Sequence, residues 1–234
     1  MGSAVGVDII KIIGEALRGV YLSKWYYFNY YWYPATEPMG LNLQHQNNIK
    51  KITMAKKALI LIDIQNEYFE KGALELVNPV PASENARKVL ERFREQNLPI
   101  VHIQHIMPAG APFFIEGTNA VEIHDNVKPK DGEKLFVKQF PNSFRDTGLL
   151  EHLKSNDITD LVILGMMTHM CVDATTRAAF DFGFNCTVIG DACASKDLEI
   201  KNQKVKAIDV HNANLAALDF FYAKIQDTEE YLSA

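Results

Sequence analysis

Apolar and polar positions alternate in blocks from residue 56 onward, and the blocks match strands and helices in turn. Residues 57–63, "KALILID", form a continuous apolar run that ends in a charge, as is typical of a parallel strand covered on both faces. In residues 83–97 apolar side chains recur at helical spacing, with Ser83 as the expected N-cap,. Residues 98–106, "LPIVHIQHI", read as the next strand.

The same alternation continues to the end of the chain. A connection rich in Pro and Gly covers residues 107–133, and long loops in compact domains often carry function. The remaining expected elements are strands at 134–139, 160–166 and 185–191 and helices at 146–156, 171–183 and 202–225. This pattern predicts an α/β fold with a mostly parallel sheet and helices on both faces.

The N-terminal segment differs from the rest and predicts a boundary. Both tryptophans, Trp25 and Trp32, lie in it, and "MAKKALILIDIQ" from Met54 reads like a natural start. We therefore expect an aromatic-rich extension at 1–54 and one domain at 55–234. Charges at four positions of the first apolar stretch argue against a membrane span or signal peptide. Three interpretations stay open: an upstream reading frame or cloning artefact, a membrane-surface or partner-binding appendage, and an added structural element.

Charge and cysteine content narrow the class of protein. The net charge is −5, so a chain-wide basic surface for nucleic acid is absent. Three cysteines without CxxC spacing argue against a disulfide framework or a cysteine zinc site and favour a reducing cytoplasm.

Three chemically different residues follow strands of the expected sheet. Asp63 ends the first strand, Lys138 ends a short one, and Cys171 stands between a strand and a helix. Ligands in such folds bind beyond the carboxyl ends of the strands. A helix N-terminus and a nearby lysine would favour the thiolate, and a carboxylate can move the proton. The pattern predicts a cysteine nucleophile that forms an acyl-enzyme.

Three segments also resemble the isochorismatase-like cysteine hydrolases, a family that includes nicotinamidases and streptothricin hydrolase. They are "ALILIDIQNEYF", "FVKQFPNSF" and "ILGMMTHMCVDATTRAAFDFGF", and they align Asp63, Lys138 and Cys171 with the catalytic triad of the family. The resemblance covers about residues 55–225. It implies a three-layer α/β/α fold with a six-stranded, mostly parallel sheet.

The resemblance also implies details of the site. It places a cis peptide at Met166–Met167 and oxyanion donors at the backbone N–H groups of Met167 and Cys171. The family's metal-binding D-x-H segment maps to "HIQHIMP", where His105 and Met107 replace the aspartate and the first histidine. We therefore predict no such metal and no cofactor.

Further residues are candidates for the substrate pocket, each with ordinary packing as the alternative. Tyr68 maps to a position where the family often places an aromatic ring, and His105 could face substrate. Phe113 and Phe114 lie in the long loop as a pocket wall or lid. His169 is close to Cys171, which leaves open a Cys–His dyad. All five positions are read directly from the sequence.

The leading hypothesis is hydrolysis of a small amide, lactam or carbamoyl compound through a thioester. A cyclic amide is a candidate, because the segments "GALELVNP" and "GMMTHMCVDATTRAA" look most like streptothricin hydrolase. Two alternatives stay open: isochorismatase-type vinyl ether hydrolysis, and a binding protein on the same fold. We expect a small-molecule substrate, no nucleic acid, membrane contact only through a genuine extension, and a homo-oligomer, as a dimer or tetramer.

Overall fold

The computed structural model describes residues 56–234. The expected extension at 1–54 lies outside the described residues, so its boundary stays a prediction. Within residues 56–234 no helix is both long and apolar enough to cross a bilayer.

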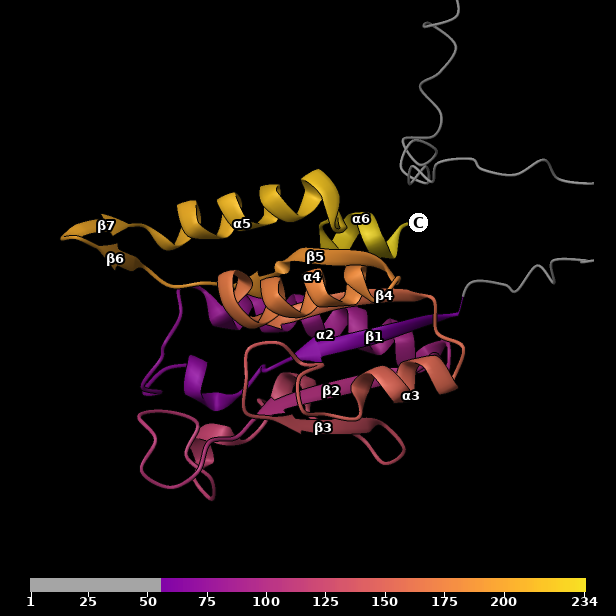
Figure 1. Cartoon of the computed structure of the whole chain (residues 1–234), viewed down its shortest axis with the longest axis horizontal. Coiled ribbons are helices and arrows are strands. Elements are labelled where there is room, and N and C mark those ends of the chain that lie inside the picture. Colours follow the sequence, from indigo (N-terminus) through magenta and orange to yellow (C-terminus); the bar gives the residue numbers. More distant parts are fainter. Residues whose placement is uncertain (1–55) are drawn as a thin grey trace, which may run out of the picture. The chain divides into compact units, whose positions relative to one another are not determined.

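One sheet of six parallel strands organises the described part of the chain (Figure 1), as the sequence predicted. Its spatial order is β3-β2-β1-β4-β5-β8. The strands are β1 (Lys57–Ile62), β2 (Ile100–His105), β3 (Lys134–Lys138), β4 (Asp160–Met166), β5 (Asn185–Ala194) and β8 (Lys224–Gln226). The central strand β1 is buried at every position after its first residue, which accounts for its continuous apolar run.

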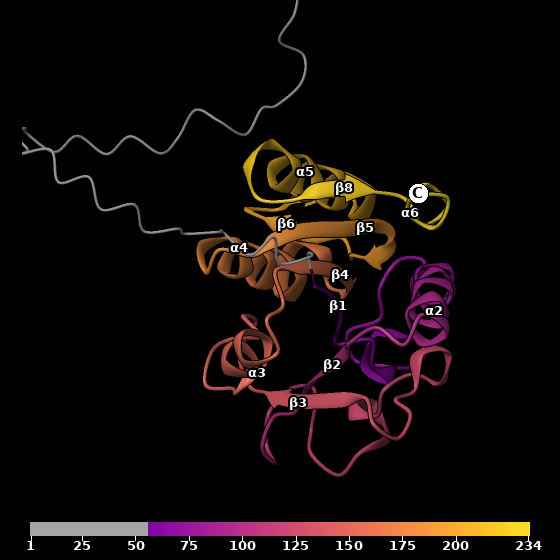
Figure 2. The same cartoon turned by 90° about the vertical axis from the view of Figure 1, so that its right-hand side faces the viewer.

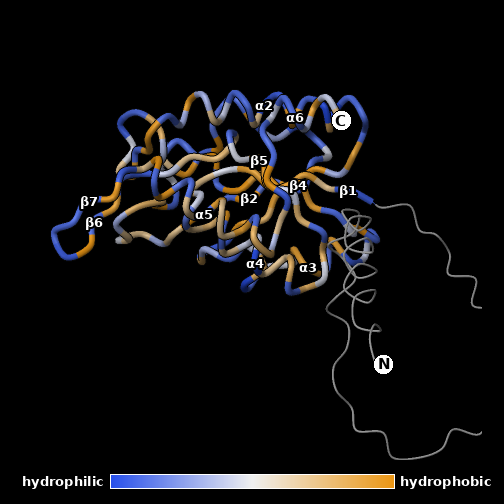
Figure 3. Tube along the Cα trace, turned by 90° about the horizontal axis from the view of Figure 1, so that it is seen from above, coloured by the Kyte–Doolittle hydropathy of each residue, from blue (hydrophilic) through white to orange (hydrophobic). Residues whose placement is uncertain are grey.

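Helices cover both faces of this sheet (Figure 2). Helices α2 and α6 lie on one face, and α3, α4 and α5 lie on the other. Figure 3 shows the same two layers from above, with hydrophobic residues along the central strands. The bounds are α2 (Pro79–Glu95), α3 (Leu149–Ser155), α4 (Asp173–Asp181), α5 (Ala207–Phe221) and α6 (Thr228–Leu232).

Several element boundaries differ from the sequence prediction. Helix α2 begins at Pro79 rather than Ser83, because the proline occupies the start of the helix and Asn78 is its left-handed N-cap,. The expected helix 202–225 is divided: an antiparallel hairpin of β6 (Leu198–Ile200) and β7 (Gln203–Val205) precedes α5, and β8 follows it. Short strands with mixed polarity carry little periodic signal, so the apolar pattern of α5 masked them.

A polar cluster around the buried His102 joins α2, β2 and the residue before β3 on the α2 side of the sheet. The Glu133 carboxylate accepts hydrogen bonds from Arg94 at 2.6 and 2.9 Å, and its Oε2 lies 2.8 Å from Nε2 of the buried His102. Burial alone would raise the pKa of Glu133, but hydrogen bonds from Arg94, from the Lys130 N–H and from His102 lower it to about 2. These contacts hold β2 and β3 in place, and the two strands end in His105 and Lys138.

We expect the Glu133→Gln substitution to lower the free energy of unfolding at pH 7 by about 1–3 kcal/mol, because it removes the charge from these hydrogen bonds. Since folding lowers the pKa of Glu133 from 4.5 to about 2, the stabilisation is present above pH 4.5 and is lost as pH falls through that interval. Urea unfolding at pH 7 and at pH 4 measures both effects. The exposed pair Arg87–Glu91 supplies a control: Glu91→Gln should change stability by less than about 0.5 kcal/mol. Equal losses in both variants would contradict the assignment.

Candidate active site

Four side chains from distant segments meet at the carboxyl edge of the sheet. Asp63 follows β1, His105 ends β2, Lys138 ends β3, and Cys171 lies in a π-helical turn after β4 (Thr168–Val172). Their relative exposures are 0, 6, 2 and 3%. An oxygen of Asp63, a ring nitrogen of His105 and the Cys171 sulfur lie within 4.8 Å of one another. The structure therefore brings together the three residues singled out from the strand ends and adds His105 to them.

The carboxylate of Asp63 and the ammonium of Lys138 form a buried ion pair. Lys138 Nζ lies 2.7 Å from Asp63 Oδ2. The ammonium also donates to the carbonyl oxygens of Phe140 and Pro141, at 3.0 and 3.3 Å. Burial favours the neutral amine, but Asp63 and the Cys171 sulfur raise the pKa of Lys138 above its ordinary value. Lys138 is therefore a fixed positive charge at neutral pH.

The thiol of Cys171 holds its proton in the substrate-free protein, contrary to the expectation from sequence. Burial and the negative charge of Asp63 raise the pKa of Cys171, and this outweighs the opposite effect of Lys138,. Cys171 lies in a π turn (Thr168–Val172) that continues directly into α4 at Asp173, so it stands in the first turn of this helical segment, as the sequence predicted. The resting site thus contains a neutral thiol beside an ion pair.

Gln65 fixes the position of His105. Its side-chain amide donates to the His105 carbonyl oxygen at 2.8 Å and to the Val121 carbonyl oxygen at 2.7 Å. Its Oε1 accepts the His105 N–H at 2.7 Å. The end of β2 is therefore attached to the turn after β1.

Aromatic side chains enclose the site on one side. Phe114 stacks on the His105 ring, with centroids 4.9 Å apart and planes 9° apart. Tyr68 and Phe113 each meet Phe114 edge to face. Burial and the nearby Cys171 and Asp63 raise the pKa of Tyr68. The Tyr68 phenol is therefore close enough to both groups to interact with them electrostatically. The aromatic residues chosen from the sequence thus form one cluster next to the thiol.

Glu67 holds this aromatic wall, and sequence reasoning missed it. Its Oε2 accepts the N–H of Phe114 at 3.1 Å, and its Oε1 accepts the N–H of Ala73 at 2.9 Å. Phe114 has a φ of 53°, a strained value for a bulky residue, so this contact helps to hold it. Glu67 stands in the mixed segment "IQNEYF" after the first strand, where no local pattern distinguishes it from a surface residue.

His169 makes a different contact from the one a Cys–His dyad needs. Its Nδ1 lies 2.6 Å from Ser195 Oγ, and the cluster around the thiol contains His105 as its imidazole. We therefore assign His169 to the connection between the π turn and the end of β5.

The backbone at the end of β4 is tightly constrained. The Met166–Met167 peptide bond is cis, at the position that the family resemblance indicated. Gly165 just before it has a φ of 132°, and a Cβ there would lie 2.0 Å from the Ile62 carbonyl oxygen. Only glycine allows β4 to approach β1 this closely at the point where both strands deliver site residues.

The site does not fit the metal centre of the nicotinamidase-like members. The two positions that should carry ligands are occupied by His105 and Met107. Met107 has a thioether side chain, and its backbone N–H donates to the Phe114 carbonyl oxygen. Asp63, His105 and Cys171 are suitable ligand types, but the Lys138 ammonium already lies 2.7 Å from the carboxylate. A fixed cation at this distance opposes a second one.

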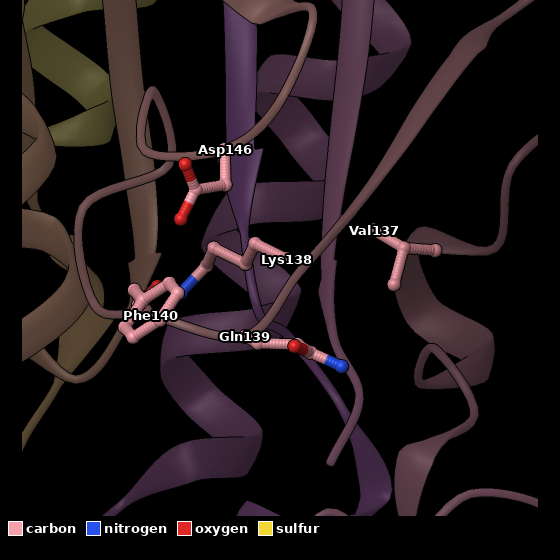
Figure 4. Close-up of a pocket in the computed structure, with 5 residues that line it drawn as sticks. All are labelled: Val137, Lys138, Gln139, Phe140 and Asp146. Carbon is pink, nitrogen blue, oxygen red and sulfur yellow. The ribbon is translucent and has the colours of Figure 1, made fainter. Parts of the chain in front are cut away.

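A small pocket of about 220 Å³ lies next to Lys138 (Figure 4). Its lining residues are Val137, Lys138, Gln139, Phe140 and Asp146. In Figure 4 the Lys138 side chain extends toward Phe140. The pocket shares only Lys138 with the group formed by Asp63, His105, Lys138 and Cys171, whereas the thiol and the carboxylate are enclosed by protein.

We expect the Asp63→Asn substitution to speed alkylation of Cys171 by iodoacetamide at pH 8, because it removes the negative charge that raises the thiol pKa. The rate should rise about tenfold for each unit by which the pKa falls. In the wild-type protein Cys171 should react slowly below pH 9. Peptide mass spectrometry over a pH series measures both, and the exposed Asp157→Asn variant is the control. Fast wild-type alkylation at pH 7 would contradict a protonated resting thiol.

Comparisons with known proteins agree with this fold. The model of the isochorismatase domain matches residues 57–219. An isochorismatase family protein of Bacillus subtilis is 46% identical over 75% of this chain and 98% of its own length. A streptothricin hydrolase of Streptomyces noursei is 31% identical over 61% of this chain and 51% of its own length. The crystal structure of an isochorismatase hydrolase from Oleispira antarctica covers 78% of this chain and 98% of its own, with 43% identity and a TM-score of 0.75. The chain therefore belongs to the isochorismatase family of hydrolases.

Proposed function

We propose that this protein hydrolyses a small amide, lactam or carbamoyl compound through a thioester on Cys171. The observation that carries the proposal is the enclosed set of a thiol, a carboxylate and an ammonium at one edge of the sheet. A thiol next to a proton acceptor is the arrangement that covalent catalysis needs. A packing cysteine has no need of a buried ion pair, which is expensive to keep out of water.

Acylation begins with transfer of the Cys171 proton to the Asp63 carboxylate. The sulfur attacks the substrate carbonyl carbon as the proton leaves, and the carbonyl oxygen gains a negative charge. Asp63 then gives the proton to the nitrogen and the C–N bond breaks. The amine of a linear amide departs, whereas the amine of a lactam remains attached to the acyl group on Cys171. The raised pKa of the resting thiol favours transfer in step with attack, with no standing thiolate.

Deacylation repeats the same proton path with water. Asp63 takes a proton from the water molecule that attacks the thioester carbonyl carbon. The C–S bond breaks, the proton passes to the sulfur, and the carboxylic or carbamic acid departs. The charge of Lys138 stays constant throughout. It stabilises the carboxylate while Asp63 is ionised, and it stabilises the negative charge on the sulfur while Asp63 holds the proton.

The backbone after β4 supplies the oxyanion donors in this proposal. The N–H groups of Met167 and Cys171 flank the turn that carries the sulfur, and backbone N–H groups are suitable donors to an alkoxide. The constraint at Gly165 fixes this turn before substrate arrives. Such preorganisation is the main source of electrostatic stabilisation in acyl transfer.

The enclosed site favours a compact substrate. Asp63, Lys138 and Cys171 are each 3% exposed or less, which leaves little room around the sulfur for an extended peptide or polymer. One relative is named a streptothricin hydrolase, another a maleamate amidohydrolase. These names support C–N hydrolysis of small molecules, with a cyclic amide as one candidate. The homo-oligomer and the cytoplasmic location stay predictions.

We expect Cys171→Ala to lower kcat/KM by roughly 10³-fold or more on any amide that the wild type hydrolyses, because the nucleophile is lost. Cys186→Ala is the matched control: Cys186 is also a buried free cysteine, lies at the start of β5 and should retain activity within about threefold. Retained activity in Cys171→Ala would exclude the thioester route.

The covalent intermediate distinguishes this mechanism from vinyl ether hydrolysis. Acid quenching during turnover should yield intact protein heavier by the acyl group, with the added mass on the Cys171 peptide. Vinyl ether hydrolysis needs no adduct on sulfur. Turnover with no adduct at any quench time, together with full activity in Cys171→Ala, would favour the vinyl ether alternative.

A further inference from the structure

The hairpin of β6 and β7 exposes one apolar face. Leu198 pairs with Val205 across the hairpin, and Ile200 lies on the same face because side chains two apart on a strand point the same way. These three side chains are 37, 36 and 64% exposed, in that order. Glu199 and Lys204 pair on the other face. An isolated two-stranded hairpin is at best marginally stable in water, so its apolar face calls for a partner surface.

Helix α5 also exposes apolar side chains on the side that faces away from the sheet. Ile208 near its start is 58% exposed and Phe220 near its end is 88% exposed. The exposed alanines between them are Ala213, Ala216 and Ala217. The polar residues on this side are Asp209, Asn212 and Asp219. A helix with one face in water normally carries mostly polar residues there, so this outer side is suited to a second packing partner.

The hairpin and the helix form one continuous unit. The Asp197 carboxylate accepts the Ala207 N–H at 2.8 Å, which attaches the base of the hairpin to the start of α5. Figure 1 shows the hairpin at this end of α5, projecting beyond the main sheet. Helix α5 has 15 residues and is therefore roughly 22 Å long. Phe220 lies at the far end of this length, so within one chain it does not reach the hairpin.

The exposed apolar area is of the size that a dimer uses. Phe220 and Phe221 are 88 and 55% exposed. Since a phenylalanine carries roughly 150–250 Å² of surface, these two residues leave about 200–350 Å² in water. A standard interface buries roughly 800 Å² on each partner. Two side chains therefore supply about a quarter or more of this area, and the rest of α5 and the hairpin add to it.

We propose that a second copy of this chain covers this surface in a two-fold dimer, with the two α5 helices crossing antiparallel. Two-fold contacts use the same patch on both subunits and are the commonest in homo-oligomers. The patch is complementary to itself, because its largest side chain, Phe220, and the uncovered hairpin lie at opposite ends of one helix. An antiparallel crossing brings Phe220 of each copy to the hairpin of the other, and the alanines between allow the helices to approach.

Sedimentation velocity of the full chain over a concentration series tests the surface. We expect a wild-type dimer, and we expect Phe220→Asp and Ile200→Asp each to raise its dissociation constant by roughly thirtyfold or more, as for a central interface residue. Val80→Asp is the matched control, because Val80 is also an exposed valine-type apolar side chain, at 48%, but lies at the start of α2. It should leave the dissociation constant unchanged within threefold.

Two results would overturn the proposal: a wild-type protein that stays monomeric at every concentration, or an assembly that both aspartate variants leave intact. A wild-type tetramer that falls to dimers in Phe220→Asp would support this surface as one of its contacts. Circular dichroism of each variant shows whether it is folded, which we expect because the substituted side chains are exposed.

Cross-linking between copies tests the antiparallel geometry without a charged substitution. The Phe220→Cys and Ile200→Cys proteins are mixed and treated with a short bismaleimide, to which the three buried cysteines of the wild type should react slowly. We expect a product that joins position 220 of one copy to position 200 of the other, identified by peptide mass spectrometry. Val80→Cys in place of Phe220→Cys should give no such product. A dimeric mixture that yields no 220–200 product would contradict the proposed crossing.

Discussion

The ion pair between Asp63 and Lys138 is the interaction on which the site depends. It joins the ends of β1 and β3 across β2, and both side chains are almost completely buried. Removing one partner of a buried pair commonly costs about 3–5 kcal/mol, whereas an apolar replacement of the whole pair can be neutral. Stability therefore does not explain the pair. The proposed chemistry does, because the pair places a carboxylate and an ammonium beside the Cys171 thiol.

Topology explains why part of this site could be predicted from sequence. Parallel strands place their carboxyl ends at one edge, so the three strand-end residues Asp63, Lys138 and Cys171 had to approach one another once the strands were found. Residues three apart on a strand point to opposite sides of the sheet. Accordingly, His102 pairs with Glu133 on the α2 side of β2, and His105 meets Lys138 in the site.

What could not be predicted depends on distances that no local pattern encodes. The thiol pKa is the sum of burial, one carboxylate and one ammonium, and its direction changes with small shifts among them. The π turn at Cys171 has the same residue types as an α-helix start. Glu67 reads as a surface residue until Phe114, from a loop far along the chain, donates to it. Each of these features is a tertiary effect.

The four site residues are widely separated along the chain, and this has a consequence for how the sulfur behaves before folding is complete. Residues 63, 105, 138 and 171 meet only after strands β1 to β4 have paired, and such non-local pairing is slow. Until then Cys171 is an ordinary exposed thiol with a pKa near ~8.5, open to oxidation. Folding raises that pKa and buries the sulfur. The finished sheet therefore shelters the Cys171 sulfur from oxidants, and the nascent chain is the vulnerable form.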